Sequence, residues 1–355
     1  MMPQTAFSRE EIADILGLRD KTKIEAIRQT AQDVLLKECG DGVYMRGLVE
    51  ISNACRCDCC YCGIRKSNRT VERYTLTQED ILKIARKCAA IGYGSIVLQS
   101  GERQDPAFLD ELVDTLRRIK EETRGDHLPD GLGITLCIGE QTESAYRRLF
   151  EAGAHRYLLR IETTNPTLFA QIHPPEQKFE TRLACLRTLK KIGYQVGTGV
   201  MIGLPGQTLL DLADDILFFK NEDIDMIGMG PFIPHKDTPL GALPCPDASE
   251  RFRLGLMMIA ATRLVLRDVN IAATTALQAL DPLGREKALR YGANVMMPLM
   301  TPEGPRENYE LYPGKPFINE TSEACHAGLA ANIAAAGRTL GLNVWGDAPH
   351  ATRKA

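Results

Sequence analysis

Residues 48–62 read Leu48-Val49-Glu50-Ile51-Ser52-Asn53-Ala54-Cys55-Arg56-Cys57-Asp58-Cys59-Cys60-Tyr61-Cys62. The short apolar run 48–52 predicts a strand, and the loop after it holds five cysteines. Three of them, Cys55, Cys59 and Cys62, form a Cys-x3-Cys-x2-Cys triplet. A cubane iron–sulfur cluster has four irons, so three thiolates leave one iron free to bind a ligand from outside the protein. The stretch therefore predicts a strand that ends at a [4Fe-4S] site with an open iron.

Beyond this stretch, short β-rich apolar runs alternate with longer amphipathic segments. A capping box at Thr77 to Asp80 predicts the start of one helix, and Gly92 predicts its end. Strands that alternate with helices imply a parallel sheet, so we expect an α/β fold, a complete (β/α)8 TIM-type barrel, with an open doubly wound sheet as the alternative. The eight expected strands lie near 48–52, 95–99, 133–138, 157–161, 195–202, 225–229, 270–275 and 293–298.

The barrel is expected to carry an extension at each end. The first forty residues look helical, with a capping box from Ser8 to Glu11 and apolar residues at helical spacing. No sequence repeat or long linker interrupts the chain. We therefore predict one structural domain with an N-terminal helical extension (1–44), the barrel (45–300) and a C-terminal helical extension that closes it (301–355).

Composition is typical of a globular enzyme. The chain is 44% hydrophobic and 25% charged, and its 43 basic and 46 acidic side chains give a net charge of −3, so nucleic acid is not an expected partner. The start has no apolar signal region, and no run reaches the roughly 18 apolar residues that a membrane span needs. Eleven cysteines, five of them in one loop, make a poor disulfide framework but suit a metal site in a reducing compartment. We expect a cytoplasmic protein.

Two other chemistries fit the cysteines. Cys57 and Cys60 form a Cys-x2-Cys pair that zinc could use, but no second ligand pair follows at finger or ribbon spacing. The second is a non-enzymatic iron–sulfur scaffold or electron carrier, although four protein ligands usually close such a cluster. A scaffold or carrier would have no binding site for an additional organic cofactor, which would distinguish it from an enzyme.

Unusual polar residues gather where the expected strands end. In a barrel of this type the carboxyl ends of the strands form one rim, which carries the active site. We therefore expect the cysteine loop to share this rim with Gln99-Ser100-Gly101-Glu102, Thr135 and Gly139-Glu140, Arg160 and Glu162, Met201-Ile202-Gly203, and Thr274-Thr275.

The triplet, with an aromatic residue just before its third cysteine, resembles the signature of the radical S-adenosylmethionine (SAM) enzymes. The resemblance implies that SAM chelates the open iron. Gly101-Glu102 resembles the element that engages the methionyl amino group, and 199–206 resembles the segment along the adenine. Glu162 suits the ribose hydroxyls and Arg182 the methionyl carboxylate. The expected cofactor-binding residues are Tyr61, Ser100, Gly101, Glu102, Glu162, Arg182 and Met201.

A substrate pocket is expected inside the barrel mouth. Arg160, Thr135, Thr274 and Thr275 would make it cationic and rich in hydroxyls, which suits a small anionic, amino-acid-like ligand. Second-rank substrate contacts are Met226, Met297 and Tyr309.

Longer segments resemble one branch of the superfamily, the family of the [FeFe]-hydrogenase maturase HydE. They span most of 45–316 and include 98–102, 156–166, 203–208, 228–234, 273–275, 292–298 and 309–315. The resemblance implies one [4Fe-4S] cluster, SAM, and a 5′-deoxyadenosyl radical that acts on a small cysteine-bound iron carbonyl cyanide precursor of the diiron subcluster. It also implies other hydrogenase maturation proteins and an electron donor as partners.

One position departs from that family. Its members often hold a second cluster with a C-terminal Cys-x7-Cys-x2-Cys triplet, and the matching residues here are Phe317, Cys325 and Gly328. We therefore predict no second cluster. Among relatives, methylornithine synthase, a lysine isomerase, is the stronger alternative; biotin synthase needs further cluster ligands, for which Cys137 and Cys185 are the obvious candidates.

Overall fold

A curled sheet of parallel strands forms the centre of the computed structural model, which describes residues 7–316 and 322–354. Neighbouring strands are hydrogen-bonded in the order β10-β1-β2-β3-β4-β5-β7-β9. The edge strands approach each other, since a parallel bridge pairs Ala272, just after β9, with Val295 in β10. These eight strands are β1 (Gly42–Ser52), β2 (Ser95–Ser100), β3 (Gly133–Cys137), β4 (Ala154–Leu158), β5 (Gln195–Thr198), β7 (Met226–Ile227), β9 (Asn270–Ile271) and β10 (Val295–Met296).

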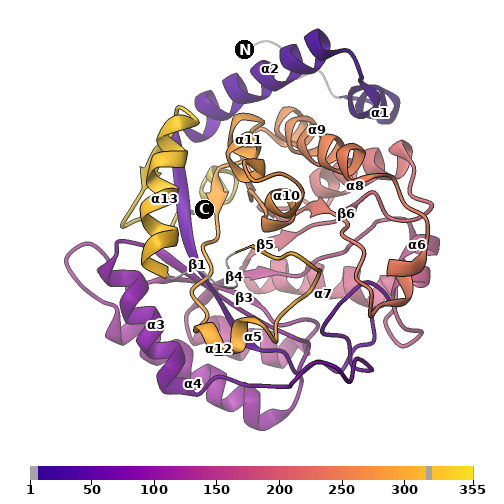
Figure 1. Ribbon diagram of the computed structural model, residues 1–355. Coiled ribbons are helices and arrows are strands. Elements are labelled where there is room, and N and C mark those ends of the chain that lie inside the picture. The colour runs from indigo at the N-terminus through magenta and orange to yellow at the C-terminus, as the bar shows by residue number, and fades with distance from the viewer. Residues whose placement is uncertain (1–6, 317–321, 355) are drawn as a thin grey trace.

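Helices surround this sheet (Figure 1). The helices predicted in the first forty residues and after Thr77 are present, and Thr77 caps α3 as predicted. The helices are α1 (Arg9–Gly17), α2 (Lys21–Cys39), α3 (Gln78–Ala90), α4 (Pro106–Glu122), α5 (Glu143–Glu151), α6 (Pro166–Ile172), α7 (Phe179–Ile192), α8 (Leu209–Asn221), α9 (Ala248–Leu266), α10 (Thr275–Leu280), α11 (Gly284–Arg290), α12 (Glu303–Arg306), α13 (Ser322–Ala335) and α14 (Pro349–Thr352), with the 3-10 turn η1 (Pro239–Ala242).

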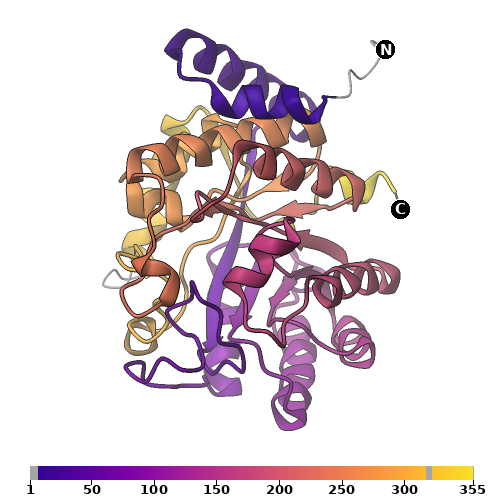
Figure 2. The same cartoon turned by 90° about the vertical axis from the view of Figure 1, so that its right-hand side faces the viewer.

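The N-terminal helices pack onto the outside of the barrel wall. Figure 2 shows α1 and α2 lying across α8 and α9. Ile12 and Leu16 are fully buried in the same apolar core as the strands. β1 begins at Gly42, so it starts before the predicted boundary at residue 45. None of the helices within the described ranges combines the length and apolar character that a bilayer crossing requires.

The C-terminal extension contains a strand as well as helices, which differs from the expected helical extension. β11 (Thr339–Gly341) pairs in parallel with the start of β1, where Gly42 lies opposite Thr339. The early residues of β1 extend past β2 and leave backbone groups for β11 to satisfy. A second small sheet, β6 (Met201–Ile202) with β8 (Gly230–Pro231), was also not predicted as a separate pair.

The tail after β11 packs against the amino-terminal ends of the strands, away from the cysteine loop. The fully buried Arg156 of β4 donates to the Trp345 carbonyl (2.6 Å) and to Asp347 (2.8 Å). Arg46 of β1 donates to the Gly346 carbonyl at 2.9 Å. These bonds hold the base of the barrel, so the opposite rim is free to carry the site.

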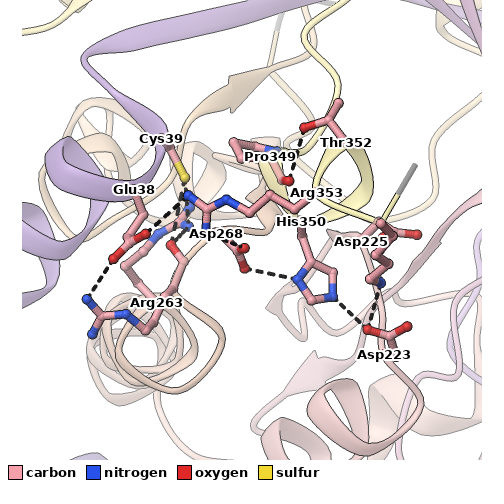
Figure 3. Close-up of polar contacts among 12 residues, drawn as sticks. Glu38, Cys39, Asp223, Asp225, Arg263, Asp268, Pro349, His350, Thr352 and Arg353 are labelled. Atoms are coloured by element: carbon pink, nitrogen blue, oxygen red, sulfur yellow. Dashed lines mark hydrogen bonds and ion pairs between the residues drawn. The ribbon is translucent and has the colours of Figure 1, made fainter. Parts of the chain in front are cut away.

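Polar contacts fix the last turn of the chain, as Figure 3 shows. His350 lies between two carboxylates, with its Nδ1 3.0 Å from Asp268 and its Nε2 2.7 Å from Asp223. Arg353 donates to Asp268 (3.0 Å) and to Glu38 at the end of α2 (3.3 Å). The cluster therefore links the N-terminal helices, the start of β7 and the chain end.

This cluster should make stability depend on pH. The hydrogen bond to Asp268, opposed by partial burial and aided by Asp223, raises the pKa of His350 above 6.5. Its stabilising contribution is therefore complete below about pH 6.5 and lost as the pH rises through the folded-state pKa. We expect His350→Gln to lower the free energy of unfolding most near pH 5.5, and progressively less as the pH rises through the folded-state pKa, as measured by urea denaturation. His127→Gln is the control, because His127 is exposed. If His350→Gln lowered the free energy of unfolding by the same amount at every pH, the expectation would be contradicted.

Candidate active site

The cysteine loop follows β1 directly, and its three expected ligands lie close enough to influence one another. The Sγ of Cys55 accepts the backbone N–H groups of Cys57 (3.4 Å) and Glu102 (3.3 Å). The contact with the Cys57 side chain and the N–H groups of Cys57 and Glu102 lower the pKa of Cys55 to about 7, against the opposing effect of burial. Burial raises the pKa of Cys62 to about 12, and burial with the neighbouring Cys62 and Cys55 raises that of Cys59. Three thiolates at these positions need a positive centre among them.

This donor set fits a cubane cluster better than a single ion. Each thiolate of a cubane binds a different iron, so its ligands need not converge on one point. In residues 7–316 and the described part of the C-terminal extension, no three Cys, His, Asp or Glu side chains converge as a single metal ion requires.

The other two loop cysteines have different surroundings. Cys57 is buried and donates its thiol to the Oε1 of Glu102 at 3.2 Å. Cys60 packs against an apolar cluster that includes Leu168 and Leu204. Its backbone is held as well, because its N–H donates to the Ile172 carbonyl at 2.9 Å.

Gly101, directly after β2, allows the cysteine loop to pack closely against the backbone at the end of that strand. A Cβ at Gly101 would overlap the Ala54 carbonyl oxygen and lie 2.7 Å from the Cβ of Cys55. Ser100 turns its hydroxyl onto the Gly101 carbonyl (2.6 Å). Glu102 lies beside the loop, accepts the Glu140 N–H (2.9 Å), and has its pKa raised by burial.

Two ion pairs stand at the ends of β3 and β4. Arg160 donates to both carboxylate oxygens of Glu162, at 2.9 and 3.1 Å from its Nε. Arg182 of α7 donates to Glu140 at 2.6 Å and to the Arg160 carbonyl. Glu162 has a φ of 65°, a conformation uncommon for a non-glycine residue, and its backbone is held by Gly199 and Met201. Glu140 was expected on this rim together with Gly139, but it was not among the predicted cofactor-binding residues.

Tyr61, within the cysteine loop, faces the end of α6. Its hydroxyl is 3.2 Å from the Nε2 of His173, and the two rings meet edge to face with centroids 5.5 Å apart. Its ring also packs on the apolar cluster that holds Cys60, to which Met201 belongs. Tyr61 and Met201 therefore stand close together, where the sequence predicted the adenine.

One cavity of about 1210 Å³, counting the solvent at its open mouth, runs from the cysteine loop into the barrel. The predicted residues that line it are Tyr61, Cys62, Arg160, Glu162, Met201, Thr274, Thr275 and Met297. Other polar side chains that line it are Gln99, which was expected on the rim, and Glu50, Cys137, Tyr312 and Lys315, which were not predicted as cofactor or substrate contacts.

The remaining predicted substrate contacts lie outside this lining. Thr135 and Met226 line a separate, smaller cavity of about 360 Å³, and Met297 lines both cavities. The smaller cavity lies nearer the barrel base, because Arg46, which bonds the Gly346 carbonyl there, also lines it. Thr135 accepts a long hydrogen bond from Arg156 (3.4 Å). Tyr309 is buried behind the wall, with its hydroxyl 3.2 Å from the Nε2 of Gln99.

The two threonines after β9 differ. The Thr275 hydroxyl is 2.6 Å from that of Tyr312. The Thr274 hydroxyl is buried with no hydrogen-bond partner among the described residues, although it lines the large cavity. A buried unpaired hydroxyl is unfavourable unless a ligand satisfies it, so Thr274 suits a polar substrate group.

The positions that match a second cluster are mostly beyond the described residues. Phe317 lies outside them, and so does the side chain of Cys325, while Gly328 is part of α13. The expected absence of a second cluster stays a prediction.

Comparisons with known proteins agree with this geometry. A model of the radical SAM superfamily matches residues 49–219. The [FeFe] hydrogenase maturase subunit HydE of Thermotoga maritima is 45% identical over 341 residues, 96% of this chain and 93% of that protein. A 3-methylornithine synthase of Methanosarcina acetivorans is 25% identical over 86% of this chain and 83% of its own length. The crystal structure of methylornithine synthase (PylB) has a TM-score of 0.81 at 22% identity over 95% of both chains, a likeness in fold.

Proposed function

The chain belongs to the radical SAM superfamily and, within it, to the family of the [FeFe]-hydrogenase maturase HydE, and we propose that it acts on a small cysteine-bound iron carbonyl cyanide precursor of the hydrogenase diiron subcluster. It is an enzyme of hydrogenase maturation by this membership. The observation that carries the proposal is the larger cavity, which joins the cysteine loop to charged and hydroxyl side chains in the barrel.

The predicted residues divide into two groups, and members of both line this cavity. Cys55, Cys59 and Cys62 would hold a [4Fe-4S] cluster, which, when bound with SAM, supplies the electron that cleaves SAM to methionine and a 5′-deoxyadenosyl radical. Glu162 and Arg182 would orient SAM. A second group would hold the substrate: Arg160, Thr274, Thr275 and Met297. It meets the first group where Arg160 pairs with Glu162.

The barrel enclosing this path is proposed to be complete. Beside the bridge between Ala272 and Val295, the Ala273 N–H donates to the Val295 carbonyl at 2.9 Å, and the Asn294 N–H donates to Ile271 at 2.9 Å. These bonds support closure between β9 and β10. The divisions 1–44, 45–300 and 301–355 are kept as a proposal, with the core shared by all three as support for one domain.

Partners and compartment follow from the same proposal. Other hydrogenase maturation proteins would exchange precursor with this enzyme, and an electron donor would reduce its cluster. Cluster ligands must be reduced thiols, which supports a reducing compartment such as the cytoplasm.

The substrate is tested by stimulation of SAM cleavage. The reconstituted protein is given SAM and a reductant without oxygen, and 5′-deoxyadenosine is followed with the iron–cysteine precursor, with lysine or with neither. We expect the precursor to stimulate its formation. Stimulation by lysine alone would instead assign a methylornithine synthase activity.

SAM affinity should depend on two side chains. We expect Glu162→Ala and Arg182→Ala each to weaken SAM binding about ten- to a hundredfold, because a lost hydrogen bond to a charged group is worth about 1.5–3 kcal/mol. Arg187→Ala is a matched control, since Arg187 lies on the same helix but pairs with Glu222 at the surface. Calorimetric titration of the reconstituted variants measures the affinity; wild-type affinity in both would remove these residues from the SAM site.

Iron content tests the single cluster. We expect about four irons per reconstituted chain, the content of one cubane, and no loss in Cys325→Ser. About eight irons, with a fall to about four in Cys325→Ser, would show a second cluster. Iron and sulfide analysis of the purified protein makes the measurement.

A further inference from the structure

A segment that follows α12, here called the mouth strap (residues 308–315), crosses the open end of the barrel. On one side it meets the cysteine loop: the Asn53 side chain donates to the Asn308 carbonyl (2.6 Å), and the Gly63 N–H donates to the Leu311 carbonyl (3.0 Å). A Cβ at Gly63 would overlap the Glu310 carbonyl, so the strap lies directly against the loop that carries the cluster ligands.

The strap also supplies part of the substrate wall. Leu311, Tyr312 and Lys315 line the large cavity. The Tyr312 hydroxyl meets Thr275, and the Tyr309 hydroxyl meets Gln99. Tyrosine side chains on an irregular segment keep such positions only if their backbone is held.

One buried ion pair holds this backbone. The Lys315 ammonium pairs with Glu50 of β1 and donates to the Tyr309 carbonyl at 2.9 Å. The Lys315 and Glu50 side chains are only 6% and 1% exposed. Thr301 donates its hydroxyl toward Glu50 (3.4 Å) and accepts the Glu50 N–H (2.9 Å). The pair thus ties the end of the strap to the first strand of the barrel, immediately below the cysteine loop.

A buried pair of this kind is weak evidence for stability. Removing two charges from water costs several kcal/mol per ion, and apolar replacements of similar size are often as stable. What an ion pair supplies is geometry, because a lysine here must point at one carboxylate and one carbonyl. Both partners line the cavity, so this geometry is set where the substrate binds.

We propose that Lys315 is a positioning residue for the substrate, which acts by fixing the mouth strap through Glu50 and the Tyr309 carbonyl. Tyr312 then keeps its place on the cavity wall and Tyr309 its place behind that wall. Glu162 and Arg182, which would orient SAM, are held by contacts outside the strap. This role rests on the proposed function for its substrate, but the ordering of the strap does not.

Two variants and one control test the proposal. Lys315→Met removes the cation but leaves Glu50 buried without its partner, which can impair folding. The double variant Glu50→Gln/Lys315→Met removes both charges and avoids that difficulty. Lys287→Met is the control, because Lys287 pairs with Asp281 at 2.6 Å outside the cavity.

Hydrogen exchange of the cluster-free protein provides the first readout, because it needs no activity. In both Lys315 variants the amides of the strap should exchange at least about tenfold faster than in the wild type, with the barrel strands unchanged. In the loaded enzyme, KM for the iron–cysteine precursor should rise about tenfold or more, with the SAM Kd within about twofold.

Two results separate the possible failures. A folded double variant with wild-type strap exchange and wild-type KM would overturn the role of Lys315. Faster strap exchange in a protein whose wild type never cleaves SAM would leave the strap ordering supported, and would reject the proposed function instead.

Discussion

Cys59→Ala is expected to abolish SAM cleavage, with a fall of more than about a thousandfold in 5′-deoxyadenosine formation. Cys59 is one of three thiols that can hold a cubane with an open iron, and two ligands leave a second iron unsupported. The electron must pass from the cluster to the bound SAM at short range, so a displaced or lost cluster stops the reaction. Chromatography of the anaerobic reaction, with iron content measured in parallel, makes the test.

The loop provides its own matched control in Cys60→Ala. Cys60 packs against apolar side chains, and replacing it removes a small, partly buried group without removing a ligand. We expect near wild-type cleavage and iron content. Cleavage retained in Cys59→Ala but lost in Cys59→Ala/Cys57→Ala would show that Cys57 replaces the missing ligand, and would contradict the simple three-ligand assignment.

Gly101→Ala is expected to have the second largest effect. The added Cβ would overlap the Ala54 carbonyl and press on the Cβ of Cys55, and backbone atoms cannot move aside as a flexible side chain can. Overpacking costs about 1–3 kcal/mol, which should lower Tm by a few degrees. Because the displaced atoms belong to the first cluster ligand, iron incorporation should fall well below that of the wild type.

Gly125→Ala controls for the substitution itself, since a Cβ there meets no atom within 4 Å. It should keep wild-type Tm and iron content. A Gly101→Ala protein with full iron and unchanged SAM cleavage would show that the loop can move away from β2 without cost, and the close packing would then not matter for the cluster.

Local patterns predicted the elements of the fold well. Apolar runs separated by capped helices indicated the eight parallel strands, and Ser8 and Thr77 cap the helices that they were expected to begin. Pairing between distant segments was not predictable in the same way. β11 contacts β1 across nearly the whole chain, and its short sequence, Thr339–Gly341, has no pattern that distinguishes it from a loop.

The candidate site shows the same division. Residues at strand ends converge because the strands are parallel, so Arg160, Glu162 and Thr274 could be placed on one rim before the structure was known. The depth of a side chain within the barrel could not be predicted in this way. Thr135, for example, lines the smaller cavity instead of the large one. Partners brought from distant segments were also missed, as with Lys315, which reaches Glu50 from 265 residues away.

The most direct test of the central claim is a single anaerobic measurement of SAM cleavage by the reconstituted wild-type protein. With cluster, SAM and reductant all present, methionine and 5′-deoxyadenosine should form in equal amounts, and neither should form when cluster or reductant is omitted. A protein that holds its four irons but forms no 5′-deoxyadenosine, with or without the iron–cysteine precursor, would contradict the radical SAM assignment and would favour an iron–sulfur scaffold.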